Sequence, residues 1–295
     1  MIGYDAMVTH AAAIVDLPVG LVSVSGPDAL TFLQSLLSQD LDDLAVGDTR
    51  HALLLEPQGK LIADHHVVRV TEDDYWLRCE PEVAAQLASG LARFKIRVKV
   101  AIEDRTAQSR RVIVCGPHAA EVVPVAPTGV GVVRTDWTID SLVVSKFEFI
   151  GPAELVIGIE LGTIEPADAE ALETLRIEAR VPRQPHDIDE RTIAQEASLD
   201  VDAVSFTKGC FVGQELVCRI DSRGHVNRTL RRITASAPIP LAADVSYEGK
   251  IVGSITSSAI SPRSGPIALA TLRREVPAGA PITVGDLGAT CLDGP

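Results

Sequence analysis

Beyond Pro240 the sequence contains only short apolar runs, separated by glycine and proline, and no apolar repeat long enough for a helix. The runs cover residues 251–256, 267–272 and 282–284. Short strands joined by frequent turns are typical of a small β-sandwich or β-barrel. The change in composition at residues 235–240 (ASAPIP) therefore predicts a domain boundary, with residues 1–235 forming one domain and residues 236–295 a C-terminal β-domain.

The first 235 residues alternate between helical and strand-like patterns. Pro27 and Asp28 favour the start of a helix, and leucines then recur at helical spacing as far as Leu41. Similar openings at Pro81 and Pro166 predict two more helices. Strand patterns occupy residues 52–55, 61–70, 93–100, 142–149 and 155–161. This mixture predicts an α+β fold, in which we expect an internal boundary near residue 105.

Charge, cysteine and histidine content argue against several classes of protein. The chain has 40 acidic and 27 basic residues and a net charge of −13, which disfavours direct binding to nucleic acid. Five scattered cysteines without a C-x-x-C pair argue against a disulfide framework, and no histidine spacing indicates a metal site. No apolar stretch approaches the ~18 residues of a membrane span, and residues 1–16 lack the basic start of a signal peptide. We therefore expect a cytoplasmic protein in a reducing compartment.

The segment from residue 203 to residue 232 holds six bases against two acids, which indicates either a site for an anionic ligand or a solvated surface patch. Its most informative part is KGCFVGQE, residues 208–215, in which two glycines permit tight backbone geometry. A cation such as Lys208 close to Cys210 would favour the thiolate. Cys210 is therefore a candidate nucleophile, redox-active thiol or transient metal ligand. The alternative is a small buried hydrophobic residue in a glycine turn.

This segment resembles the K-G-C-[YF]-x-G-Q-E motif of the YgfZ family, which lies within the superfamily of the glycine-cleavage T-protein. Similar blocks occur at residues 26–34, 57–60, 175–196 and 249–262, so the resemblance covers nearly the whole chain. It implies a ring of subdomains around a central channel that holds tetrahydrofolate or a derivative, with a small C-terminal β-barrel. It also implies an accessory protein for the assembly or repair of iron–sulfur clusters, whose clients include enzymes of tRNA modification.

The resemblance also implies roles for individual residues. Glu178 is the candidate carboxylate for the adjacent N–H donors of a pterin; the alternative is a helix-surface residue paired with Arg176. The anionic tail of folate would favour bases of the 203–232 segment. The catalytic candidates are Cys210, Lys208 and Asp64. The cofactor-binding candidates are Glu178, Arg176, Gln214, Glu215, Arg223 and Arg228.

One departure from the T-protein pattern concerns residues 59–64 (GKLIAD). T-proteins carry paired aspartates here, near the reacting nitrogens of folate, whereas this chain has Ala63 followed by Asp64, and Lys60 replaces a glycine. The loss of one carboxylate removes a partner for proton transfer, which makes glycine cleavage doubtful and leaves enzymatic activity open. The alternative function is a tetrahydrofolate-dependent aminomethyltransferase or another one-carbon transferase.

Overall fold

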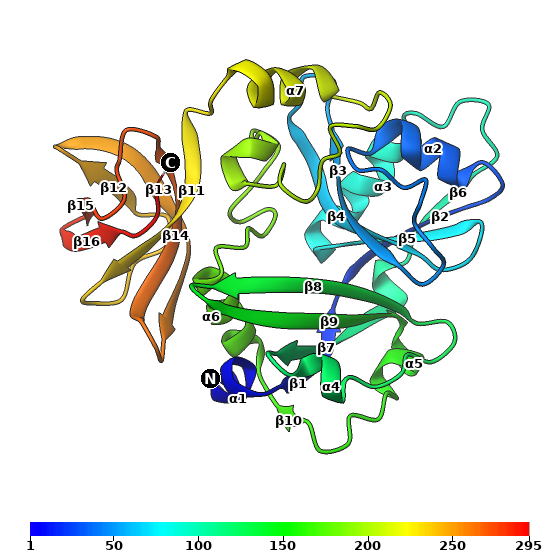
Figure 1. The fold of residues 1–295 in the computed structure, drawn as a ribbon, viewed down its shortest axis with the longest axis horizontal. Helices are drawn as coiled ribbons and strands as arrows, with labels where there is room; N and C mark the ends of the chain where they lie inside the picture. The colour runs from blue at the N-terminus through cyan, green and yellow to red at the C-terminus, as the bar shows by residue number, and fades with distance from the viewer. Residues whose placement is uncertain (295) are drawn as a thin grey trace.

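The computed structural model describes residues 1–294, apart from the side chain of Arg223. Two five-stranded sheets and a closed six-stranded barrel lie around the middle of the molecule (Figure 1). This arrangement confirms the predicted α+β class and the C-terminal β-barrel. No helix in the described part of the chain is long and apolar enough to cross a membrane.

The first sheet has the strand order β3-β4-β5-β2-β6, and its neighbours are antiparallel. Its strands are β2 (Gly20–Ser25), β3 (Thr49–Leu55), β4 (Leu61–Arg69), β5 (Asp74–Cys79) and β6 (Ala101–Asp104). The helices α2 (Ala29–Leu36) and α3 (Ala84–Ala92), the latter preceded by η1 (Pro81–Val83), bury the apolar side chains of one face. Because side chains alternate along a strand, the polar residues of β3, β4 and β5 face the middle of the molecule.

The second sheet has the order β10-β1-β7-β9-β8, with β1 and β10 parallel and the other neighbours antiparallel. Its strands are β1 (Ala12–Pro18), β7 (Ser109–Gly116), β8 (Gly131–Ile139), β9 (Leu142–Pro152) and β10 (Glu165–Pro166). The helices α1 (Tyr4–Thr9) and α6 (Ala169–Glu178) pack on one face, and α4 (Ala119–Val122) and α5 (Ala153–Ile157) on the other. The chain passes from the first sheet to the second at η2 (Thr106–Gln108).

The barrel closes in the order β11-β14-β13-β12-β15-β16. Its strands are β11 (Arg228–Ala235), β12 (Asp244–Tyr247), β13 (Lys250–Ser261), β14 (Gly265–Arg273), β15 (Pro281–Val284) and β16 (Leu287–Cys291). The barrel therefore begins at Arg228, one strand before the predicted boundary at residue 236. The arginines of β11 obscured its strand pattern, although Leu230 and Ile233 are buried and the guanidinium of Arg231 donates to the Val276 carbonyl inside the barrel.

The leucine pattern after Asp28 produces a shorter helix than predicted. α2 ends at Leu36, and Leu37 is extended with a ψ of 150°. The next N–H, that of Ser38, then donates to the carbonyl of Leu53 in β3 at 3.0 Å. Leu41 is nevertheless fully buried. The helical spacing of the leucines thus predicted that Leu41 is buried, but it did not predict where the helix ends.

Two predicted strands are wrong. Residues 93–100 form a turn and an irregular loop after α3, in which the N–H of Phe94 donates to the last turn of that helix and Arg97 has a φ of 59°. Residues 155–161 form the end of α5 and a loop, and Val156 packs against the outer face of the second sheet. A strand needs a neighbouring backbone for its hydrogen bonds. Neither segment has one: each packs some apolar side chains on an existing core, such as Val100 and Val156, and leaves others exposed, such as Ile96 and Ile157.

Candidate functional site

A cavity of about 410 Å³ lies at the centre of the molecule, between the two sheets. Its volume is in the range of ~300–1,000 Å³ that is usual for small-molecule sites. The strands β3, β4 and β5 line one wall and β7, β8 and β9 another, while α6 and the loop 181–186 close it. The main apolar side chains that line it are Leu17, Pro18, Ile113, Trp137, Leu172 and Val181. The main polar ones are His51, Asp64, His66, Arg78, Glu80, Arg111, Lys146, Glu173, Arg176 and Arg183.

One face of α6 supplies a carboxylate on an otherwise apolar wall. Asp168 begins the helix by accepting a hydrogen bond from the N–H of Ala171 at 2.8 Å. Counted from the first residue of the helix, positions one, four, five and eight share a face. The residues there are Ala169, Leu172, Glu173 and Arg176, and all four line the cavity. Glu173 therefore faces the cavity between apolar neighbours.

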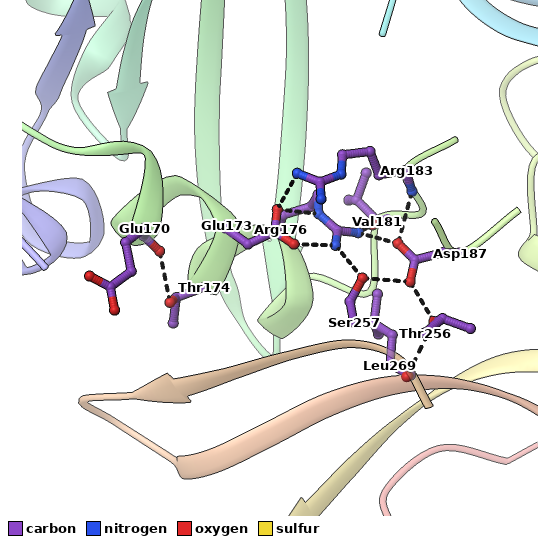
Figure 2. A network of polar contacts seen from close by, with 10 residues as sticks. All are labelled: Glu170, Glu173, Thr174, Arg176, Val181, Arg183, Asp187, Thr256, Ser257 and Leu269. Atoms are coloured by element: carbon purple, nitrogen blue, oxygen red, sulfur yellow. Dashed lines mark hydrogen bonds and ion pairs between the residues drawn. The ribbon is translucent and has the colours of Figure 1, made fainter. Parts of the chain in front are cut away.

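Arg176 fixes this carboxylate in place (Figure 2). Its Nε and Nη2 donate to the two oxygens of Glu173 at 2.9 and 2.7 Å, and Nη1 donates to Asp187 at 2.7 Å. Nη2 also donates to Ser257 of β13 at 2.8 Å, which ties α6 to the barrel. Burial raises the pKa of Glu173, but the hydrogen bonds and charges of Arg176 and Arg183 outweigh burial and lower it. Glu173 is thus held ionised at neutral pH.

Glu178, predicted as the pterin ligand, lies outside the lining of this cavity. It is buried and accepts hydrogen bonds from the hydroxyl of Tyr4, at 2.8 and 2.7 Å, and from that of Ser261. The five residue steps from Glu173 to Glu178 turn the helix by about 140°, so the two carboxylates leave it in different directions. This placement argues against Glu178 as a direct ligand. Arg176, also a predicted ligand, does line the cavity.

Asp64 faces the cavity from β4, and its carboxylate is bound to a histidine that the sequence analysis did not select. Nε2 of His51 lies 2.5 Å from Asp64, and Nδ1 lies 3.0 Å from Asp202. The ring also stacks on His66, with centroids 4.5 Å apart. Burial lowers the pKa of His51, but the two carboxylates outweigh it and raise it to about 10. The imidazolium in turn lowers the pKa of Asp64 despite its burial, so this pair is ionised at neutral pH.

Ala63 is on the opposite side of β4 from Asp64. It is fully buried in the core beneath the helices of the first sheet, as the alternation along a strand requires. In this chain, position 63 therefore faces away from the cavity. The alanine at that position removes no group from the cavity wall, so the placement of Ala63 gives no structural support to the inference that glycine cleavage is doubtful.

The ammonium of Lys208 in the KGCFVGQE segment is held by backbone carbonyls. It donates to the carbonyls of Gln34, Leu37 and Gln39, each at 2.8 Å, where the chain leaves α2. These three bonds use all three N–H groups of the ammonium. Burial lowers the pKa of Lys208 to about 8. Lys208 is thus a clamp on the chain after α2, while Cys210 is exposed, as expected for a reactive thiol.

The remaining candidates lie away from the cavity. Gly213 has a φ of 83°, and a Cβ there would lie 2.6 Å from the Glu56 carbonyl, so glycine is required where the segment crosses the β3–β4 turn. The helix α7 (Gln214–Arg223) begins at the next residue. The short helix η3 (Ala194–Ala197) precedes the KGCFVGQE segment in the chain. Gln214 and Glu215 line a separate, shallow surface hollow of α7. Arg228 is exposed at the start of β11, and the side chain of Arg223 lies outside the described residues.

The sequence analysis missed Glu173, His51, Arg111 and Arg183 as cavity residues. A signal for Glu173 was present, because it shares the i, i+3, i+4 and i+7 face of α6 with Arg176. His51 could not be selected from spacing, since its partners come from β4 and from a loop more than a hundred residues away. In the sequence, Arg111 resembles an ordinary surface arginine of a strand. It lines the cavity only because the second sheet packs against the first.

The contacts of Lys208 predict that its replacement destabilises the protein without changing the pH dependence of labelling at the Cys210 thiol. Lys208→Met should lower the free energy of unfolding by about 2 kcal/mol or more, because three carbonyls lose a charged donor. Urea unfolding measures this loss, with the exposed Lys60→Met as control. In a Cys218→Ser background, the pH dependence of thiol labelling at Cys210 should be unchanged. A clear rise in the thiol pKa of the variant, without loss of stability, would restore the activating role.

The ion pair of His51 predicts a pH dependence of stability. Its pKa is raised from 6.5 when unfolded to about 10 when folded, so its stabilising contribution is complete below pH 6.5 and is lost as the pH rises to about 10. The destabilisation caused by His51→Gln should therefore be largest at the acidic end of this window and shrink toward its alkaline end. Denaturant unfolding across the window measures it, with the exposed His225→Gln as control. A difference that is constant with pH would contradict the charged state of His51.

Comparison with known proteins places these observations in a family context. Residues 5–130 match the model of the GCVT N-terminal domain. An aminomethyltransferase of Symbiobacterium thermophilum is 26% identical, over 86% of this chain and 76% of that protein. One of Cutibacterium acnes is 29% identical, over 90% and 80%. An uncharacterized protein of Haemophilus influenzae is 26% identical, over 71% and 69%.

A solved structure agrees with the fold. The glycine cleavage system aminomethyltransferase T of Bartonella henselae superposes with a TM-score of 0.78, at 21% identity, over 98% of this chain and 87% of that one. The agreement includes the C-terminal barrel, because nearly the whole chain is covered. Residues 5–130 therefore resemble a GCVT N-terminal domain, and the chain has the fold of an aminomethyltransferase.

Proposed function

We propose that this protein binds tetrahydrofolate, or a derivative of it, in the central cavity. The observation that carries the proposal is Glu173, an ionised carboxylate in a cavity that Trp137 and other apolar side chains also line. A pterin presents N–H donors on a flat ring, so it needs a carboxylate acceptor and an apolar or aromatic surface. Oε2 of Glu173 already accepts from Arg176 and Arg183, and Oε1 accepts once from Arg176, so one lone pair of Oε1 is left for such a donor.

The cavity also fits the acceptor groups of a folate. The buried Nε atoms of Arg111 and Arg183 have no hydrogen-bond partner in the described residues, although both side chains line the cavity. A buried donor without a partner costs about 1–3 kcal/mol, so carbonyl or carboxylate oxygens of a ligand are favoured there. When bound, a reduced folate would supply nitrogen atoms that carry one-carbon groups. Asp64, held as a carboxylate by His51, would stabilise positive charge in the same chamber.

We further propose that the protein uses this ligand as an accessory factor for iron–sulfur proteins, including enzymes of tRNA modification. Support comes from the resemblance of residues 208–215 to the YgfZ motif and from the exposure of Cys210 on an open loop. An exposed thiol is accessible to a partner protein. Because Cys210 is absent from the cavity lining, its chemistry would be directed to such a partner rather than to the bound folate.

A one-carbon transferase is the second candidate. Asp64 supports it, because an ionised carboxylate faces the cavity and position 63 does not disturb that arrangement. The relatives named aminomethyltransferase support it as well. Folate-dependent transfer of an aminomethyl group from a carrier protein, retained in Cys210→Ser and lost in Asp64→Asn, would favour this function over the accessory role.

The folate proposal predicts different effects for two glutamates of α6. Glu173→Gln should weaken tetrahydrofolate binding by about tenfold or more, because a charged acceptor becomes neutral. Glu178→Gln should change the affinity by less than about twofold, since Glu178 binds Tyr4 and Ser261 instead. Anaerobic titration calorimetry measures both, and unfolding midpoints check that the variants fold. No affinity of the wild type for any reduced folate would refute the proposal, and the reverse order of the variants would reassign the ligand to Glu178.

The accessory role predicts a requirement for the thiol in cells. In cells that lack their own homologue, the wild type should restore the activity of an iron–sulfur enzyme, and Cys210→Ser should not. Cys218→Ser, a half-buried thiol on α7, is the matched control and should restore activity. Full rescue by Cys210→Ser would rule out thiol chemistry, and failure of the wild type would overturn the iron–sulfur role.

A further inference from the structure

A buried charge cluster forms one side of the central cavity. Glu148 of β9 is 1% exposed at its side chain, and its Oε2 accepts from Arg78 Nε at 3.0 Å and from Arg111 Nη1 at 3.1 Å. Its Oε1 accepts from Lys146 Nζ at 2.6 Å. Glu80 lies 3.2 Å from Arg78 and 3.6 Å from Arg111. Three cations therefore surround two carboxylates, and Arg78, Arg111, Lys146 and Glu80 all line the cavity.

Part of this cluster has a structural role. Arg78 and Glu80 come from the end of β5 in the first sheet, whereas Arg111, Lys146 and Glu148 come from the second sheet. The ion pairs thus join the two sheets across the cavity. The burial of Glu148 raises its pKa, but the three cations outweigh burial and hold the pKa well below its usual range. This role uses Nη1 of Arg111 and leaves its Nε without a partner among the described residues.

A second arginine approaches the same place from the other side. Arg183 lies in the loop after α6, where its Nη1 donates to Glu173 at 3.1 Å. Its charge, with those of Arg78 and Arg111, lowers the pKa of Glu80. Like Arg111, it lines the cavity and has a buried Nε that no described residue accepts from. Two guanidinium groups on different elements therefore border one chamber, each with a donor that no described residue uses.

We propose that the region of the cavity between Arg111 and Arg183 is a carboxylate-binding subsite. A guanidinium presents its Nε and one Nη as a planar fork that matches the two oxygens of a carboxylate. The local excess of cations over acids favours a single negative charge. The carboxylate has two sources: the glutamate of a bound folate, in which case this inference rests on the proposed function, or a separate small carboxylic acid that shares the cavity with the folate.

Calorimetry with matched ligands tests this subsite and separates the sources. The ligands are tetrahydrofolate, 6-methyltetrahydropterin, which has the ring without the tail, p-aminobenzoylglutamate, which is the tail alone, and acetate. Arg111→Gln should weaken binding of tetrahydrofolate and of the isolated tail by about tenfold or more, because a charged hydrogen bond is lost. It should change binding of 6-methyltetrahydropterin by less than about twofold. If the acid is separate, the variant loses acetate binding and keeps its affinity for tetrahydrofolate.

Two further variants complete the test. Arg110→Gln, the neighbouring residue on β7, is the control, because Arg110 pairs with Asp16 and does not line the cavity. Arg183→Gln repeats the experiment on a loop if Arg111→Gln fails to fold. Unchanged affinity of both cavity variants for the tail-bearing ligands and for acetate would overturn the subsite. If the wild type binds no reduced folate, the proposed function fails, whereas acetate and p-aminobenzoylglutamate still decide the subsite.

Discussion

The site depends on the contacts of one guanidinium, that of Arg176. It holds both oxygens of Glu173, reaches Asp187 in the following loop and donates to Ser257 of the barrel. Without it, Glu173 would be a partly buried carboxylate whose pKa rises and whose side chain is free to turn. The barrel thus contributes to the cavity without lining it, because Ser257 and Asp187 determine where Arg176, and through it Glu173, can lie.

The cavity wall combines apolar surface with charges that are already paired. Glu148, Asp64 and Glu173 each bind a cation from another element: Glu148 binds Arg78 and Arg111, Asp64 binds His51, and Glu173 binds Arg183. Lys146 and Arg176 bind the carboxylates of their own elements. Such pairs cost desolvation free energy that nonpolar packing would avoid. Their concentration around one chamber, whose open space Asp64 and Glu173 border, is therefore better explained by ligand recognition than by stability. Pre-oriented charges need no reorganisation when a ligand arrives.

How well each feature could be predicted from the sequence depends on how far apart in the chain the interacting residues lie. The hairpin of β3 and β4, the helix α3 and the barrel strands after residue 240 were predictable, because turn residues and periodicity are local signals. β11 was not recognised, because Arg231 is buried inside a strand, and the 93–100 strand failed because alternation alone supplies no partner. Asp64 and Arg176 were selected correctly as cavity-lining residues. Glu173 and His51 were not, since their roles depend on contacts between distant segments.

The cavity and the exposed thiol share a segment of chain, which raises the question of whether they are coupled. Asp202 accepts from His51 behind the cavity wall, and Lys208 clamps the same segment to the chain after α2. The Asp202 side chain is 67% exposed, so this ion pair contributes about 0–1 kcal/mol. The clamp of Lys208 uses three charged hydrogen bonds, each of about 1.5–3 kcal/mol. The position of Cys210 is therefore determined by Lys208 rather than by the cavity, so we expect the proposed ligand binding and the proposed thiol chemistry to be separable.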